Sequence, residues 1–283
     1  MQKVDSVSAL RAQVKAWHQQ QLTVAFVPTM GNLHKGHLSL VKRAQALADK
    51  VIVSIFVNPL QFDDKEDLVA YPRTMDADIK QLTSVNCDLV FTPSAYVMYP
   101  EGMKSHANVV VPGMDDKLCG KNRPGHFDGV ATVVSKLLNM VQADIAIFGE
   151  KDYQQLLLIK KLVRDLNLPV EVIASETHRE KSGLAMSSRN QYLTKSEQKK
   201  AAVLYQTLNS MKTQLEQGEQ DFIVLQQQAI AQLKSAGFTP EYVEVRRAED
   251  LELATVEDTQ LRILAAAHLG KARLIDNIAC HLA

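Results

Sequence analysis

Short apolar runs alternate with segments of helical spacing through the first 176 residues, and this alternation limits the possible folds more than any other feature. The expected strands are residues 22–27, 51–57, 87–91, 145–148 and 170–174, and the expected helices are residues 1–20, 38–48, 74–85, 127–141 and 153–166. The run 51–57 shows little apolar–polar alternation, which is typical of a parallel strand covered on both faces. The pattern predicts a doubly wound α/β domain with a mostly parallel sheet, which binds ligands at the carboxyl ends of its strands.

The pattern changes after about Glu176. Helices are expected at residues 195–216 and 222–236, and short strands at 242–246, 261–267 and 272–276. This arrangement predicts a smaller C-terminal α+β domain, so that the chain divides into residues 1–176 and 177–283. Within the first domain, residues 61–72 are expected to form a polar loop, and Val109-Val-Val111 is interpreted as a small strand.

The charges of the chain balance, because Lys plus Arg and Asp plus Glu each number 32. A broad nucleic-acid surface usually needs a basic excess, so we expect no nucleic-acid partner. The three cysteines are far apart and form no Cys-x-x-Cys pair, as expected of reduced thiols. No signal segment opens the chain, and no apolar run reaches the roughly 18 residues of a membrane-spanning helix. We therefore expect a cytoplasmic protein without a membrane partner.

The segment from Val24 to His37 carries the strongest chemical signal. An apolar run ends at Pro28, a turn containing glycine follows, and His34 and His37 flank Gly36 before the next helical pattern. A strand, a tight turn and a helix N-terminus form a phosphate site, to which two imidazoles can add hydrogen bonds. The alternatives are an ordinary loop that contains histidines or a metal site, although no third ligand lies nearby in the sequence.

Three further loops have residues suited to phosphate, and the first two also have a plainer structural interpretation. Gly149-Glu-Lys-Asp152 offers a cation in Lys151, while Asp152 can cap a helix or meet a hydroxyl or a magnesium ion. Met186-Ser-Ser-Arg189 is either a phosphate clamp or a helix cap with a surface arginine. Arg123-Pro-Gly-His126 is another basic loop. Because no nucleophile motif or P-loop is present, the set favours transfer at phosphorus through positioning and electrostatics.

Six segments carry a resemblance to known proteins. They are Val27-Pro-Thr-Met-Gly-Asn-Leu-His-Lys-Gly-His37, Ser54-Ile-Phe-Val-Asn-Pro-Leu-Gln-Phe62, Tyr71-Pro-Arg73, Arg123-Pro-Gly-His-Phe127, Phe148-Gly-Glu-Lys-Asp-Tyr-Gln-Gln155 and Leu184-Ala-Met-Ser-Ser-Arg-Asn190. In order and content they resemble the pantothenate synthetase (pantoate–β-alanine ligase) family of the nucleotidyltransferase superfamily. The resemblance continues to Arg273-Leu-Ile-Asp-Asn277 and so covers nearly the whole chain.

The resemblance implies a Rossmann-like fold and an ATP-dependent ligase that makes pantothenate. In this family (R)-pantoate reacts with Mg-ATP to give a pantoyl adenylate and pyrophosphate, and the amine of β-alanine then displaces AMP. The implied partners are therefore the small molecules pantoate, β-alanine and ATP, with Mg²⁺. Members are typically cytoplasmic homodimers, and the smaller domain is expected to close over the ATP site.

The resemblance also assigns roles to residues. His37 is the expected catalytic imidazole, with His34 as its partner on the phosphates and Lys151 at the α-phosphorus. The expected substrate-binding residues are Gln61, Gln155 and Arg123. The expected ATP-binding residues are Met30, Gly31, Asn32, Leu33, His34, Lys35, Gly36, His37, Gly149, Glu150, Lys151, Asp152, His178, Met186, Ser187, Ser188 and Arg189.

One position departs from the family pattern. At His178 the family usually has an apolar residue whose backbone touches the nucleotide, and a backbone contact survives that change. Two other interpretations remain at this point. A cytidylyltransferase-like enzyme of the same superfamily does not explain the paired glutamines, and zero net charge argues against a regulatory or tRNA-binding module.

Overall fold

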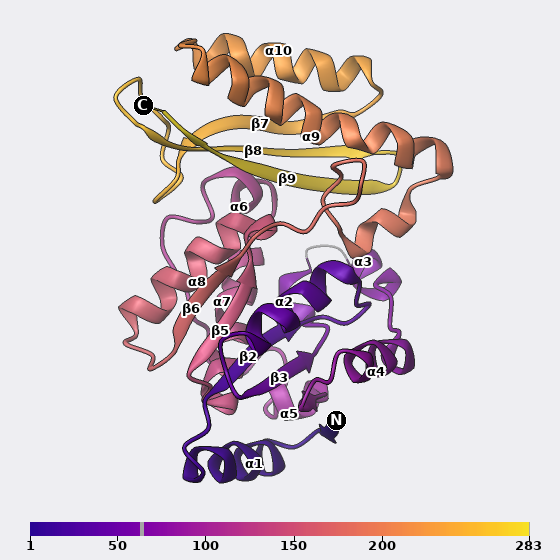
Figure 1. The fold of residues 1–283 in the computed structure, drawn as a ribbon, viewed down its shortest axis with the longest axis vertical. Coiled ribbons are helices and arrows are strands. Elements are labelled where there is room, and N and C mark those ends of the chain that lie inside the picture. Colours follow the sequence, from indigo (N-terminus) through magenta and orange to yellow (C-terminus); the bar gives the residue numbers. More distant parts are fainter. Residues whose placement is uncertain (63–64, 283) are drawn as a thin grey trace. The chain divides into compact units, whose positions relative to one another are not determined.

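The computed structural model describes residues 1–62 and 65–282 of the chain (Figure 1). It divides into two compact units. The first comprises Met1–Glu150 and Gln154–Glu176, and the second comprises Lys151–Tyr153 and the chain from Thr177 onward. Three residues that interrupt the first unit therefore group with the C-terminal part of the chain.

The first unit is built on a six-stranded parallel sheet in the order β1-β4-β3-β2-β5-β6. The strands are β1 (Gln2–Val4), β2 (Val24–Thr29), β3 (Lys50–Ile55), β4 (Leu89–Phe91), β5 (Ile145–Gly149) and β6 (Glu171–Ser175). The chain moves from β2 toward β3 and β4 on one side, and from β5 to β6 on the other. The predicted doubly wound α/β fold is thereby confirmed.

Helices cover this sheet. They are α1 (Val7–Gln19), α2 (Lys35–Gln45), α3 (Lys65–Ala70), α4 (Met75–Ser84), α5 (Ala95–Met98), α6 (Leu118–Asn122), α7 (His126–Val141) and α8 (Tyr153–Asp165), with 3-10 turns η1 (Pro59–Gln61) and η2 (Glu150–Asp152). On one face, Val41 of α2 and Leu82 of α4 join the buried cluster of Val27 and Val53. Helices α1 and α7 contact each other and β2. The sheet is therefore a rigid, buried platform for the loops that leave it.

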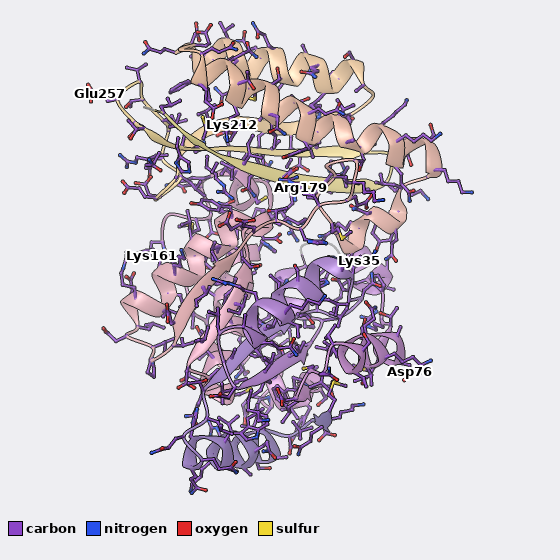
Figure 2. All side chains as sticks on the ribbon, viewed as in Figure 1. Lys35, Asp76, Lys161, Arg179, Lys212 and Glu257 are labelled. Carbon is purple, nitrogen blue, oxygen red and sulfur yellow. The ribbon has the colours of Figure 1, made fainter. Side chains whose placement is uncertain are left out.

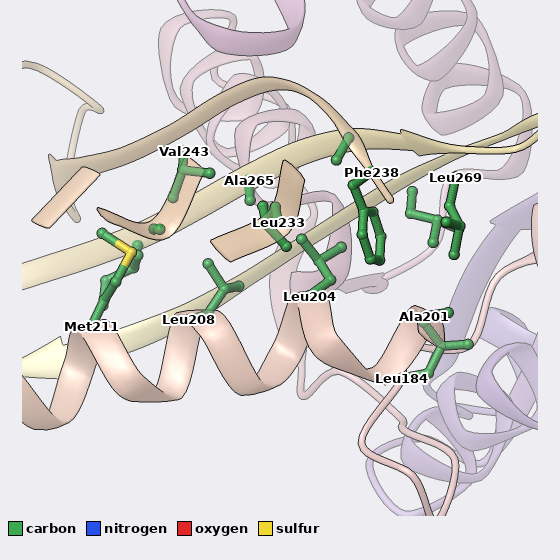
Figure 3. Close-up of a cluster of buried hydrophobic side chains, with 14 of the residues drawn as sticks. Leu184, Ala201, Leu204, Leu208, Met211, Leu233, Phe238, Val243, Ala265 and Leu269 are labelled. Carbon is green, nitrogen blue, oxygen red and sulfur yellow. The ribbon is translucent and has the colours of Figure 1, made fainter. Parts of the chain in front are cut away.

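The second unit packs two helices on a three-stranded antiparallel sheet. Its elements are η3 (Ser188–Tyr192), α9 (Lys195–Glu216), α10 (Phe222–Ser235), β7 (Thr239–Arg247), β8 (Gln260–Leu269) and β9 (Ala272–His281). Leu204, Leu208 and Met211 of α9 point toward Val243 and Ala265 of the sheet (Figure 3). This spacing along α9 forms the apolar stripe that binds a helix to a sheet.

Several local expectations were wrong. Residues 109–111 form no strand, because the Val109 N–H donates instead to the Thr132 hydroxyl at 2.9 Å. Residues 65–70 of the expected 61–72 loop are helix α3, and residues 63–64 lie outside the described part. The expected N-terminal helix begins only at Val7, because Gln2–Val4 pairs with Leu89–Phe91 as strand β1. No helix within residues 1–62 and 65–282 combines the length and apolar character needed to cross a bilayer.

Candidate functional site

Three loops of the first unit meet at one edge of its sheet. Strands β3, β2 and β5 are parallel neighbours, so their carboxyl ends lie together. The loop after β2 carries Met30 to His34, the turn after β3 carries Gln61, and β5 ends at Gly149. An added Cβ at Gly149 would lie 3.9 Å from the Leu40 side chain of α2. This edge is the topological switch point, at which doubly wound sheets bind ligands.

A buried carboxylate holds the loop between β2 and α2. Gly31 and Asn32 have φ of +80° and +49°, in the left-handed region that Gly adopts easily and Asn tolerates. Asp78 of α4 is 1% exposed and accepts hydrogen bonds from the backbone N–H groups of Asn32 at 3.0 Å and Leu33 at 2.7 Å. The carboxylate therefore fixes the turn that leads the chain into α2.

Two histidines cap the N-terminus of α2. His34 is the N-cap residue, and its Nδ1 accepts a hydrogen bond from the Gly36 N–H at 3.1 Å. His37 Nδ1 accepts from the His34 N–H at 3.3 Å, which completes a capping box made of imidazoles. The ring centroids are 4.0 Å apart. Both rings are thus held at a helix end whose N–H groups and dipole attract anions. Lys35, in the first turn of α2, is exposed (Figure 2).

The capping bonds also determine which ring nitrogen carries the proton. A nitrogen that accepts a hydrogen bond has no proton, so the neutral imidazoles of His34 and His37 are protonated at Nε2. Protonation at Nδ1 would break a capping bond. The arrangement therefore suits two neutral donors to phosphoryl oxygens, acting through Nε2.

A buried asparagine orients the side chain of Gln61. Asn58 is 1% exposed, and its Nδ2 donates to Gln61 Oε1 at 3.1 Å and to the Gly129 carbonyl at 3.1 Å. Its Oδ1 accepts from the Tyr99 hydroxyl at 2.8 Å. Gln61 Nε2 in turn approaches Met30 Sδ at 3.2 Å. Because Asn58 occupies the oxygen of the Gln61 amide, the amide nitrogen lies on the side of the β2 loop.

The main chain of Gln61 is held from the start of α7. Its carbonyl accepts from Arg123 Nη2 at 3.1 Å and lies 2.8 Å from His126 Nδ1. Arg123 Nη1 also lies 3.2 Å from His126 Nε2. A Cβ at Gly129 would come within 2.4 Å of the Leu60 carbonyl, so only glycine allows η1 to lie this close to α7. The structure therefore shows Arg123 bonded to Gln61.

The second predicted glutamine lies on α8. Gln155 is half-buried there, beside Gln154, which is 5% exposed. Gln154 donates to the carbonyls of Met114 at 2.9 Å and Lys117 at 3.0 Å and accepts from the Cys119 N–H at 3.1 Å. The side chain of Gln154 is therefore committed to holding the 114–119 segment.

Apart from Glu150, which belongs to the first unit, the remaining predicted residues belong to the second unit. Lys151 and Asp152 lie in η2, where Lys151 Nζ is 3.7 Å from Asp152 Oδ2. The Lys151 side chain is 18% exposed and that of Asp152 48%. The Lys151 carbonyl accepts from Asn277 Nδ2 of β9 at 2.8 Å. The lysine is therefore fixed through its main chain to the three-stranded sheet.

A hairpin-like loop leads to the predicted phosphate clamp. Arg179 and Ala185 form an isolated antiparallel bridge, and the Met186 N–H donates to the His178 carbonyl at 3.0 Å. Ser187 then caps η3, its hydroxyl accepting from the Arg189 N–H at 3.2 Å. The backbone carbonyl of His178 thus binds Met186, at the start of the Met186–Arg189 segment.

Sequence patterns missed the residues that support these groups. Asn58 was part of a recognised motif but had no role, and Asp78 was only one charge in a helical pattern. Asp276 and Asn277 ended the last recognised motif without a role. The available signal was a polar pair within an otherwise apolar strand segment, as with Asp276 and Asn277 in Leu274-Ile-Asp-Asn-Ile278.

A doubly wound parallel sheet with an imidazole-capped helix N-terminus at its switch point defines a nucleotide-binding α/β protein. The family model of pantoate-beta-alanine ligase matches residues 2–279. A pantothenate synthetase of Shewanella baltica (strain OS223) is 56% identical over 272 residues, 96% of each chain. One of Colwellia psychrerythraea is 53% identical over 288 residues, covering both chains in full.

Solved structures agree with these relatives. A pantothenate synthetase from Thermus thermophilus superposes with a TM-score of 0.91 at 42% identity, covering 98% of this chain and 99% of that one. A pantoate-beta-alanine ligase from Francisella tularensis, complexed with beta-gamma ATP and beta-alanine, gives a TM-score of 0.83 at 36% identity. This match covers 98% of this chain and 97% of that one. The chain belongs to the pantoate–β-alanine ligase family. It is accordingly a ligase that forms an amide bond.

Proposed function

We propose that the chain condenses (R)-pantoate with β-alanine at the site built on the N-terminus of α2, with ATP as co-substrate and a pantoyl adenylate as intermediate. The observation that carries this proposal is the pair of imidazoles held by capping bonds at Nδ1, which makes Nε2 the donor of each ring. Anionic phosphates bind well where such donors meet a helix N-terminus.

In the first step the pantoate carboxylate attacks the α-phosphorus of ATP. A carboxyl oxygen–phosphorus bond forms, the bond to the bridging oxygen of the β-phosphate breaks, and pyrophosphate leaves with the electron pair. His37 is the catalytic imidazole and His34 its partner on the phosphates, while Lys151 balances charge at the α-phosphorus. Because these groups only orient and stabilise charge, the step needs no protein nucleophile.

In the second step the amine of β-alanine attacks the acyl carbon of the adenylate. The carbon–nitrogen bond forms, the bond from the acyl carbon to the phosphate oxygen breaks, AMP leaves, and the amine loses a proton. Gln61 contacts pantoate and β-alanine, Gln155 contacts pantoate, and Arg123 is a further phosphate or β-alanine contact. The fixed amide of Gln61 supports this role, because an oriented amide distinguishes donors from acceptors in a substrate.

The nucleotide is proposed to use segments from both parts of the chain. Residues 1–176 form the nucleotide- and pantoate-binding domain in this proposal, and residues 177–283 close over ATP. Met30 to His37, Gly149 to Asp152 and the His178 backbone contact the nucleotide, and Met186 to Arg189 contact the triphosphate. Such closure would keep water from the mixed anhydride.

Magnesium is proposed to accompany ATP. Within residues 1–62 and 65–282, no group of three or more His, Cys, Asp or Glu side chains is arranged to hold a metal ion. Mg²⁺ is commonly bound through substrate phosphates, waters and one or two carboxylates, and the partly exposed Asp152 fits that description. The ion would neutralise phosphate charge and so aid the departure of pyrophosphate.

The resemblance to the pantothenate synthetase family supports a cytoplasmic homodimer. We propose neither nucleic acid nor membrane as a partner. Cys87 and Cys280 are buried thiols outside any disulfide, as expected in a reducing compartment. The equal numbers of acidic and basic residues, 32 each, support the proposed absence of a nucleic-acid surface.

Product analysis tests the proposed function. The protein is incubated with ATP, magnesium, pantoate and β-alanine, and each component is omitted in turn. We expect AMP, pyrophosphate and pantothenate in equal amounts, with pyrophosphate still released in one turnover when β-alanine is omitted. Formation of ADP and phosphate would instead show acyl-phosphate chemistry and contradict the adenylate mechanism.

A further inference from the structure

Two consecutive residues of β9 hold the Lys151 segment and the 179–185 turn that leads to Met186–Arg189. Asp276 and Asn277 are each 3% exposed. Because neighbouring residues on a strand point to opposite faces of the sheet, one side chain reaches each face. Asp276 lies in the row of Leu274 and Cys280, which belong to the apolar core, and Asn277 lies on the other face.

Asn277 anchors the segment that contains Lys151. Its Nδ2 donates to the Lys151 carbonyl at 2.8 Å, and its Oδ1 accepts from Arg262 Nε at 2.6 Å. The Arg262 guanidinium stacks on the Tyr153 ring at 4.0 Å, and the Tyr153 hydroxyl donates to the Ala248 carbonyl at 2.9 Å. Residues 151–153 are thus tied to the three-stranded sheet at both ends, which explains why they group with the second unit.

Asp276 anchors the loop that leads to Ser187. Its two carboxylate oxygens accept from Arg179 Nη1 at 2.6 Å and Nη2 at 2.8 Å, a bidentate pair (Arg179 is labelled in Figure 2). Arg179 Nη1 also donates to the Gly183 carbonyl at 3.1 Å, and the guanidinium stacks 3.9 Å above the Tyr205 ring of α9. One arginine therefore joins β9, the 179–185 turn and α9.

The two anchors are also joined to each other. The Asn277 N–H donates to Asp276 Oδ1 at 2.7 Å, and Arg179 Nη2 donates to the Asn277 carbonyl at 3.3 Å. Through these two bonds, a shift of the 179–185 turn acts on Asn277, which holds the Lys151 segment. Burying an ion pair contributes little to stability on its own. The placement of the Arg179–Asp276 pair next to the Asn277–Lys151 contact therefore points to a positioning role.

We propose that Asp276 and Asn277 are positioning residues that keep Lys151 and the Met186–Arg189 segment in a fixed relation for the adenylation step. This inference rests on the roles given to those segments under the proposed function. Asn277 acts on Lys151, which is proposed to work in the transition state, so its loss should lower kcat. Asp276 acts through Arg179 and the 179–185 turn on the segment proposed to bind the triphosphate, so its loss should raise the KM for ATP.

The test compares two isosteric variants with a matched control. Asn277→Asp keeps the contact with Arg262 but replaces the donor to the Lys151 carbonyl by an acceptor. Asp276→Asn keeps the shape but removes the charge opposite Arg179. The control is Glu241→Gln, which weakens the Arg273–Glu241 pair (2.8 Å) elsewhere on the same sheet. Pantoate-dependent pyrophosphate release is measured over a range of ATP concentrations, together with thermal unfolding.

We expect Asn277→Asp to lower kcat by about 30-fold with little change in the KM for ATP, since small misplacements of catalytic groups have effects of this size. Asp276→Asn should raise the KM for ATP by about tenfold, and so should Arg179→Lys. Because both changes disrupt the same Arg179–Asp276 contact, the variant that carries both should have no higher KM than either alone. Glu241→Gln should retain the wild-type kcat and KM. If Asn277→Asp fails to fold, Asn277→Ala replaces it, since that change buries no additional carboxylate.

The contrary results are distinct. The inference would be overturned if all variants, the control included, lost the same activity. It would also be overturned if each loss of activity matched the fraction of unfolded protein, because the role would then be purely structural. If Lys151→Ala released pyrophosphate at the wild-type rate, Lys151 would have no role in adenylation, and the inference would also be overturned. If the wild-type protein released no pyrophosphate, the proposed function itself would be contradicted. If Lys151→Ala lost activity while Asn277→Asp kept it, only the inference would be contradicted.

Discussion

In the proposed mechanism the two ring nitrogens of His37 have separate tasks, and single substitutions can separate them. An asparagine can replace Nδ1 as the acceptor for the His34 N–H but has nothing in the place of Nε2. We expect His37→Asn to fold with nearly wild-type stability and to lose about 10²- to 10³-fold in adenylation, the usual effect of removing one preorganised donor. His37→Ala should lose the same activity and also about 1 kcal/mol of stability, because the cap bond is lost too. Urea unfolding and pyrophosphate release measure the two effects, and an active His37→Asn would contradict the assignment.

Burial gives Cys87 a measurable effect on stability at alkaline pH. Burial raises the pKa of the Cys87 thiol from 9.0 to about 12. A raised pKa means that the folded protein holds the proton more tightly, so this contribution is complete below pH 9 and is lost as the pH rises toward 12. Wild-type protein should therefore lose about 1.4 kcal/mol more stability than Cys87→Ala between pH 8 and pH 10. Urea unfolding of both proteins at the two pH values tests this, and equal losses would contradict it.

The contact between η1 and α7 depends on one glycine. Gly→Ala within a helix normally stabilises it by about 1 kcal/mol, but a Cβ at Gly129 would come within 2.4 Å of the Leu60 carbonyl. We expect Gly129→Ala to destabilise the protein by about 2 kcal/mol, the typical cost of overpacking. It should also raise the KM for pantoate, because Asn58 binds the Gly129 carbonyl as well as Gln61.

A second substitution on the same helix is the control for this prediction. Asn139 lies near the C-terminal end of α7 and is exposed, so Asn139→Ala should leave the KM for pantoate unchanged. Chemical unfolding and steady-state kinetics on both variants are sufficient. A Gly129→Ala protein as stable as the wild type would show that η1 can move without cost.

The assembled protein is expected to be a dimer, as the resemblance implies. One chain has a mass of 31.5 kDa, so sedimentation equilibrium should give twice that value at micromolar concentration. A mass of 31.5 kDa that persists as concentration rises would contradict the prediction. The measurement should be repeated with ATP and pantoate, since a ligand that binds the dimer better shifts the equilibrium toward it.

Local patterns predicted the elements whose stabilising contacts lie within a few residues. The expected bounds of α9 match the structure, Lys195–Glu216, where Thr194 and Glu197 form a capping box at the start of the helix. The strand, turn and helix around His34 were also predicted, because the cap bonds join residues two and three apart. Strand β1 was missed, since its three residues form a strand only by pairing with β4 far along the chain.

The same distinction applies to the site. The sequence was sufficient to predict the α/β fold, the histidine pair, the loop glycines and the family resemblance, because each depends on residue type and short spacing. Tertiary structure was needed to show that Asp78 holds the β2 loop, that Asn58 orients Gln61, and that Asn277 binds the Lys151 carbonyl. These contacts join residues distant in sequence, and neither periodicity nor a local turn preference encodes which distant groups meet. They depend on strand order and packing, which bring buried donors and acceptors within hydrogen-bonding distance only in the folded chain.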